Sequence, residues 1–104
     1  MKKALIICSA GITSMIISKR INKTYKNKDI DITILFALGE VFLKKASDDY
    51  DLYILSPQVK HLWNDIEKKI PKKDILYLES GEYSIDEDKL KKLAEKIQER
   101  IGGR

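Results

Sequence analysis

Among its 104 residues the chain has only one cysteine, one histidine, one tryptophan and two prolines. A single cysteine cannot form a disulfide within the chain, which is typical of proteins in a reducing compartment. A single histidine cannot build a metal site, and we expect His61 to be a surface or partly packed side chain. No apolar run approaches the ~20 residues that span a bilayer, and Ala4–Ile7 is too short for the core of a secretory signal. We therefore expect a cytoplasmic protein.

The chain also lacks a strong excess of either charge. Its 20 basic and 16 acidic side chains give a net charge of +4, and the two signs alternate, as in DEDKLKKLAEKIQER at residues 86–100. This pattern is typical of a solvated surface, so no nucleic-acid partner is expected. Hydrophobic residues at 43% and charged residues at 35% indicate a soluble globular protein. The length fits a single domain over residues 1–104.

Strand and helix patterns alternate along the chain. We expect strands at residues 3–7, 29–37, 51–56 and 74–79, and helices at 14–26, 39–46, 57–70 and along an apolar stripe from Leu90 to Ile101. Ser56 is expected to cap the third helix, and SIDE at 84–87 has the capping-box pattern for the fourth, which Gly102 and Gly103 should end. Four strands alternating with four helices predict an α/β fold with a four-stranded parallel sheet and helices on both faces. Strand order 2-1-3-4 is expected, with right-handed crossovers.

This topology brings two loops together. Strands one and three are neighbours in the predicted order, so the loops that follow them, CSAGITS and SPQ, lie side by side at the carboxyl end of the sheet. Ligands of open α/β sheets bind at such a switch point. The site of function is therefore expected between these two loops.

The lone Cys8 stands at the end of the first predicted strand. A buried cysteine is most often a small hydrophobic residue, but Cys8 is followed by the small residues 9–11 and by the hydroxyls of Thr13 and Ser14. Small residues allow backbone N–H groups to turn towards a ligand, and the start of a helix attracts phosphate and stabilises a thiolate. The pattern predicts a nucleophilic cysteine that holds a phosphoryl group in a cradle of amides.

Two known phosphate loops can be compared with this stretch. A Walker loop needs Gly-x-x-x-x-Gly-Lys-Ser/Thr, which is absent. The loop is similar to that of low-molecular-weight tyrosine phosphatases, in which an arginine stands six residues after the cysteine. Here that position is Ser14, and the chain has no Asp-Pro pair to serve as the general acid of that family. Without the arginine, the loop fits a phosphoryl carrier better than a phosphatase.

Three segments together carry a more specific resemblance. LIICSAGITSMI, the later LYILSPQVKHL and the Ile-Pro of KKIPKK resemble enzyme IIB of the lactose/cellobiose (also chitobiose) class of the sugar phosphotransferase system (PTS). The resemblance covers essentially the whole chain. Ser56 stands where that family usually has glycine, and Met15 where it often has a small polar residue.

The resemblance implies a role, partners and site residues. Cys8 would take a phosphoryl group from a phosphohistidine of the IIA protein and pass it to a sugar bound by the membrane transporter IIC, with which the protein would associate. No metal or organic cofactor is expected, and a monomer suits transient contacts. Backbone N–H groups would hold the phosphoryl oxygens, and the Gln58 side chain could donate its amide; the residues of the cradle are Ser9, Ala10, Gly11, Ile12, Thr13, Ser14 and Met15.

Two other functions remain open from the residues. One is a phosphatase-like or reductase-like thiol enzyme on the same scaffold, against which stand Ser14 in place of arginine and the lack of a second cysteine. The other is a regulatory domain that binds phosphate without catalysis, in which Cys8 would be dispensable. Transfer of phosphate from a phosphorylated IIA protein to Cys8, with Cys8→Ser as the control, distinguishes the first function from the other two.

Overall fold

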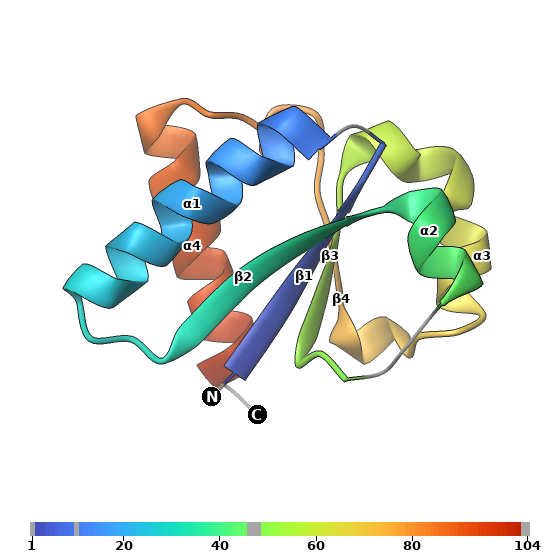
Figure 1. Cartoon of the computed structure of the whole chain (residues 1–104), viewed down its shortest axis with the longest axis horizontal. Coiled ribbons are helices and arrows are strands. Elements are labelled where there is room, and N and C mark those ends of the chain that lie inside the picture. Colours follow the sequence, from blue (N-terminus) through green and yellow to red (C-terminus); the bar gives the residue numbers. More distant parts are fainter. Residues whose placement is uncertain (1, 10, 46–48, 103–104) are drawn as a thin grey trace.

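A computed structural model describes residues 2–9, 11–45 and 49–102. Figure 1 shows a sheet with helices on both sides. The elements, with η for a 3-10 helix, are β1 (Lys2–Cys8), α1 (Gly11–Asn27), β2 (Ile32–Leu38), α2 (Gly39–Lys44), β3 (Leu52–Leu55), η1 (Pro57–Leu62), α3 (Trp63–Glu67), η2 (Lys72–Asp74), β4 (Ile75–Tyr77) and α4 (Glu87–Gly102). Within the described ranges, no helix is both long and apolar enough to cross a bilayer.

The sheet has the predicted topology. Its strand order is β2-β1-β3-β4, and every pair is parallel. Ile7 of the central strand β1 pairs with Ala37 of β2 on one side and with Leu55 of β3 on the other. The expected α/β architecture and strand order are therefore confirmed, and the ends of β1 and β3 are neighbours.

Two helical layers enclose the sheet. Figure 1 shows α1 and α4 together on one face and α2 and α3 on the other. Side chains alternate between these faces, as the pleat requires. In β1, Ile6 joins the apolar cluster under α1 and α4, whereas Ile7 joins the cluster under α2, η1 and α3. The continuous apolar run of β1 thus fills two cores at once.

The end of α1 explains why β2 begins later than expected. Asp29 has a positive φ of 59°, and its N–H donates to the Lys26 carbonyl. The N–H of Ile30 donates to the Tyr25 carbonyl at 2.8 Å. These two bonds form a Schellman motif, which uses residues 28–30 to end the helix. The predicted strand at 29–37 therefore becomes β2 at Ile32–Leu38.

Strand β2 lies at the edge of the sheet, and α1 reaches over it. The side-chain amide of Asn22 donates to the Ile34 carbonyl at 3.0 Å, and its oxygen accepts the Ile34 N–H at 2.7 Å. Both outward-facing backbone groups of Ile34 are thereby paired. The contact also joins the middle of α1 to the middle of β2.

The prediction of one helix over residues 57–70 is wrong. Residues 57–62 form the 3-10 helix η1, Val59 has non-helical angles, and α3 spans only Trp63–Glu67. The Ser56 carbonyl accepts the N–H of Val59, three residues on, and the indole N–H of Trp63 at 3.2 Å. An i to i+3 bond tightens the turn and prevents α-helical pairing from Ser56 onwards. The Ser56 side chain makes no capping bond.

The other predicted boundaries shift by a few residues. Helix α1 begins at Gly11 rather than at residue 14, so part of the expected loop is its first turn. Helix α4 begins at Glu87 because Asp86, not Ser84, is the residue that caps it: Asp86 Oδ2 accepts the N–H of Lys89, the third residue of the helix, at 3.4 Å. The predicted end of the second helix at residue 46 and the stop at Gly103 lie outside the described residues.

Candidate active site

Two loops meet at the carboxyl end of the sheet, as predicted. Cys8 is the last residue of β1, and α1 begins at Gly11. Ser56 follows β3, and its N–H donates to the Ile7 carbonyl at 3.1 Å, which continues the ladder beside Cys8. Figure 1 shows the start of α1 and the segment after β3 at this end of the sheet. Ala10 lies outside the described residues.

Cys8 is enclosed in the protein. Its side chain is fully buried, and its thiol donates a hydrogen bond to the Ala37 carbonyl, with 3.6 Å between sulfur and oxygen. The sequence places the sulfur at the open start of α1, whereas the structure turns it towards β2. A partner cannot reach the sulfur in this orientation, so any reaction at Cys8 requires the side chain to turn away from Ala37.

The first turn of α1 supplies the features of an anion site. Gly11–Ser14 contains no charged side chain, and the first N–H groups of a helix have no partner within it. The positive end of the helix dipole therefore lies three residues from Cys8. Ile12 is 71% exposed and Met15 is 40% exposed, whereas Ser14 is fully buried. Thr13 is half-buried.

Gln58 joins the two loops. Its side-chain oxygen accepts hydrogen bonds from the Ser9 hydroxyl at 3.1 Å and from the Ser9 N–H at 3.4 Å. The structure thus brings Gln58 to the Cys8 loop, as the resemblance implied. It differs in one respect, since the atom of Gln58 that faces the loop is the accepting oxygen and not the donating nitrogen.

Sequence reasoning missed Tyr83 as a site residue. This side chain comes from the loop between β4 and α4, and its hydroxyl lies 2.6 Å from the Ser14 hydroxyl. Burial raises the pKa of Tyr83 above its ordinary value, and the charge of an ionised Cys8 raises it further, while the Ser14 hydrogen bond has the opposite effect. Topology could place the loop at this end of the sheet, but nothing in the sequence pattern pairs Tyr83 with Ser14.

Ser56 has a different place from the one expected. It is fully buried, and among the described residues its hydroxyl finds no hydrogen-bond partner. Buried hydroxyls are nearly always paired, so this one is unusual. Because this chain has serine where the family usually has glycine, a hydroxyl that is unpaired among the described residues lies directly after β3, the strand next to the end of β1.

Exposed apolar side chains lie at the start of α1 and where β2 leads into α2. Besides Ile12 and Met15 of α1, they include Leu38, 42% exposed, and Val41, 51% exposed, at the start of α2. Gly39 allows α2 to approach η1, because a Cβ there would lie 2.7 Å from Leu62. The four exposed side chains Ile12, Met15, Leu38 and Val41 are called the apolar rim below. They lie at the carboxyl end of the sheet.

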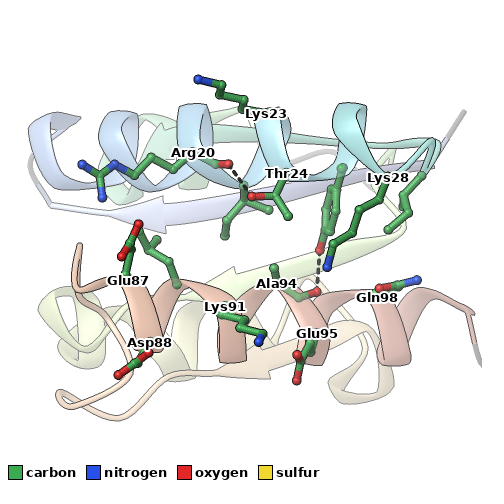
Figure 2. A pocket seen from close by; sticks show the side chains of 14 residues that line it. Arg20, Lys23, Thr24, Lys28, Glu87, Asp88, Lys91, Ala94, Glu95 and Gln98 are labelled. Carbon is green, nitrogen blue, oxygen red and sulfur yellow. Dashed lines mark hydrogen bonds between the residues drawn. The ribbon is translucent and has the colours of Figure 1, made fainter.

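A groove of about 540 Å³ lies elsewhere, between α1 and α4. Figure 2 shows charged side chains of both signs along it, among them Arg20 and Lys28 of α1 and Glu87 and Glu95 of α4. The Tyr25 hydroxyl donates to the Ala94 carbonyl across the seam at 2.6 Å. Cys8 does not line this groove, which is a solvated seam between two helices.

Comparison with known structures first defines the class of protein. The chain superposes on the lactose-specific IIB component domain of the phosphoenolpyruvate:carbohydrate phosphotransferase system of Streptococcus pneumoniae with a TM-score of 0.71. The two are 21% identical, and the match covers 90% of this chain and 95% of that domain. The fold is thus that of a IIB domain.

The sequence then gives the family. Residues 3–99 match the lactose/cellobiose-specific IIB subunits of the PTS, and the chain belongs to this family. Membership confirms the resemblance carried by the cysteine loop and the Pro-Gln-Val segment. It implies a phosphoryl-carrier role within a sugar phosphotransferase system, and IIA and IIC components as the partners of such a protein in general.

Proposed function

We propose that this protein carries a phosphoryl group on Cys8, from a IIA phosphohistidine to a sugar held by a IIC transporter. The observation that carries the proposal is the position of the sole cysteine. In a member of the IIB family, Cys8 ends the central strand and directly precedes the uncharged first turn of α1. A sulfur nucleophile and a group of free amides are thereby brought together.

The proposed reaction consists of two displacements at phosphorus. In the first, the Cys8 thiolate attacks the phosphorus, the N–P bond of the phosphohistidine breaks, and its electron pair stays on the imidazole nitrogen. In the second, a sugar hydroxyl attacks, the S–P bond breaks with its electron pair returning to sulfur, and the hydroxyl proton passes to a base of the acceptor complex. Backbone N–H groups of residues 9–15 hold the phosphoryl oxygens in both steps, and Gln58 keeps Ser9 in place.

Ser14 favours a carrier over a phosphatase. It occupies the position at which low-molecular-weight tyrosine phosphatases have an arginine, and it is buried and bonded to Tyr83. A carrier must keep its phosphocysteine from water until the acceptor arrives. Before phosphorylation the Cys8 thiol is itself buried, so the sulfur reacts only after it turns away from Ala37.

The apolar rim is the proposed docking surface for both partners. Its four exposed side chains lie at the start of α1 and where β2 leads into α2, at the same end of the sheet as Cys8, so a partner that covers them would also exclude water from the phosphoryl group. A protein that works from the cytoplasm can reach IIC through the same surface. Sharing one surface requires each partner to leave before the other binds, as a relay demands.

The test is transfer from phosphorylated IIA proteins of the lactose/cellobiose class. We expect a stoichiometric phosphoryl group on Cys8, located by mass spectrometry of the digested protein. Cys8→Ser should accept none, whereas His61→Gln, which removes the sole histidine, should accept as much as the wild type. Failure of the wild type with every donor, or full labelling of Cys8→Ser, would contradict the carrier function.

A further inference from the structure

Two kinds of hydrogen-bonding group surround the Cys8 side chain. On the β2 side stands the Ala37 carbonyl, which accepts the proton of the neutral thiol. On the β3 side stands Ser56, whose N–H donates to the carbonyl of Ile7, the residue before Cys8. A carbonyl oxygen suits a thiol but repels a thiolate, which needs donors. The β2 side thus offers the sulfur an acceptor, whereas the Ser56 N–H on the β3 side is already paired with Ile7, which leaves the Ser56 hydroxyl as the donor on that side.

The pleat places Cys8 and Ser56 on the same face of the sheet. Ile7 and Leu55 are paired and belong to the cluster under α2 and α3. The residue after each must point to the opposite face, under α1 and α4. Ser56 retains extended angles, with φ −72° and ψ 155°, so the alternation continues to it. Its hydroxyl is fully buried and free of partners in the part of the chain that is described, and it lies directly after β3, the strand next to that of Cys8, on the same face of the sheet.

A second pair of hydroxyls lies on this same face. Ser14 of α1 is fully buried, and its hydroxyl is 2.6 Å from that of Tyr83. Because burial keeps Tyr83 protonated, its hydroxyl can donate to Ser14 at all ordinary pH values. The proton of Ser14 is then free to point to another acceptor. Cys8 ends β1 and Ser14 lies in the first turn of α1, so the chain brings this pair to the same end of the sheet as the sulfur.

We propose that the hydroxyls of Ser56 and of the Ser14–Tyr83 pair form a donor cluster that stabilises the Cys8 sulfur as a thiolate. Ser56 and Ser14 donate to the sulfur, and Tyr83 is a positioning residue that acts through Ser14. This inference deepens the proposed function and rests on it for its biological meaning, because the thiolate is both the nucleophile of the first displacement and the leaving group of the second. A buried anion requires such donors.

Few charges near the sulfur compete with this cluster. The first turn of α1 and residues 56–59 contain no charged side chain. Glu40 in the first turn of α2 is exposed. Burial first, and then the charge of an ionised Cys8, raises the pKa of Tyr83, so its phenol adds no negative charge at ordinary pH. Ser14 and Ser56 are thus buried polar residues close to the end of β1 among the described residues.

The experiment is a pH titration of the thiolate ultraviolet absorbance of the isolated chain, with Cys8→Ser as the blank for the tyrosines. Ser56→Gly, which introduces the residue usual in the family, and Tyr83→Phe should each raise the titration midpoint by about one pH unit, or tenfold in thiolate. Ser14→Ala should raise it as well, and adding Tyr83→Phe to Ser14→Ala should cause no further shift.

Ser18→Ala is the matched control. Ser18 lies one turn further along α1 and also has a buried hydroxyl without a partner among the described residues, so its removal should leave the midpoint unchanged. Circular dichroism confirms that each variant is folded. Equal midpoints in wild type, Ser56→Gly and Tyr83→Phe would overturn the inference, and so would an equal shift in Ser18→Ala. The titration needs no donor protein, so its result is independent of whether IIA transfers phosphate.

Discussion

The two faces of the sheet are built differently. On one face lie α1 and α4, of 17 and 16 residues, over a mostly aliphatic core. On the other lie α2 and α3, of six and five residues, with the turns η1 and η2. Aromatic rings strengthen this second face, where Phe42 contacts Tyr53 and Trp63 contacts Tyr77 with centroids 5.7 and 5.0 Å apart.

The two faces of the sheet contribute different residues to the candidate site. Cys8, Ser14 and Ser56 point to the face with the long helices, where many turns hold the start of α1 in place. Gln58 belongs to the short-helix face and is exposed. The groups around the sulfur thus lie on the face with the long helices α1 and α4. The exposed contact of Gln58 with Ser9 comes from the face with the short helices α2 and α3.

The largest expected effect is a loss of free energy of unfolding, which we compare between two buried isoleucines, one on each face. Ile97 of α4 and Ile66 of α3 are both fully buried. Ile97→Ala should lower the free energy of unfolding by about 4 kcal/mol, because the long helix cannot close the cavity. Ile66→Ala should lower it by about 2.5 kcal/mol, because a five-residue helix can shift inwards. Urea unfolding with unchanged m-values measures both. Equal losses, or a larger loss in Ile66→Ala, would show that the two faces are equally rigid.

A smaller effect concerns the start of α4. Asp86→Ala removes the side chain that accepts the Lys89 N–H, and it should lower the free energy of unfolding by about 1 kcal/mol. Ser84→Ala is the control, because the Ser84 hydroxyl accepts only the Asp86 N–H outside the helix. Thermal unfolding of the two variants compares them. A larger loss of free energy of unfolding in Ser84→Ala would instead support the capping box that the sequence predicts.

The smallest expected effect is a pH dependence of the free energy of unfolding. It arises at Glu67, on the face with α2 and α3. The Tyr77 hydroxyl donates to Glu67 at 2.5 Å and, ahead of Lys72, lowers the pKa of that carboxyl below its ordinary 4.5. A carboxyl with a lowered pKa binds its proton less tightly in the folded state. It therefore contributes stability above about pH 4.5, and this is lost as the pH falls through the lowered value.

Tyr77→Phe should accordingly flatten the decline of stability on the acid side. Urea unfolding at a series of acidic pH values gives the slope for wild type and variant. Because Glu67 is at the surface, the difference should be small. Identical slopes in the two proteins would mean that the hydrogen bond from Tyr77 does not influence the ionisation of Glu67.

Much of the fold could be predicted because the strands are strongly apolar. The runs around Ile6 and Ile54 are buried on both faces, and only a central parallel strand has that composition. Helix ends were less predictable, since they depend on competition between nearby groups. Trp63 and Val59 both bond to the Ser56 carbonyl and change an expected α-helix into η1. No local pattern encodes this competition.

The candidate site was predictable only where it is local in sequence. Cys8 and the start of α1 are neighbours along the chain, and Gln58 follows a strand whose position topology gives. Tyr83 meets Ser14 across 69 positions, and the unpaired hydroxyl of Ser56 is a property of packing. The side to which the thiol turns likewise depends on the Ala37 carbonyl of another strand. Such relations exist only in the folded chain.

The amide of Asn22 has a consequence for how the molecule behaves among its copies. Its nitrogen and oxygen present to Ile34 the same donor and acceptor that the backbone of a fifth strand would present. An approaching chain must first displace this side chain before it can lengthen the sheet, and edges protected in this way resist aggregation. A single carboxamide on α1 thus protects the middle of the β2 edge against pairing with the strand of another molecule.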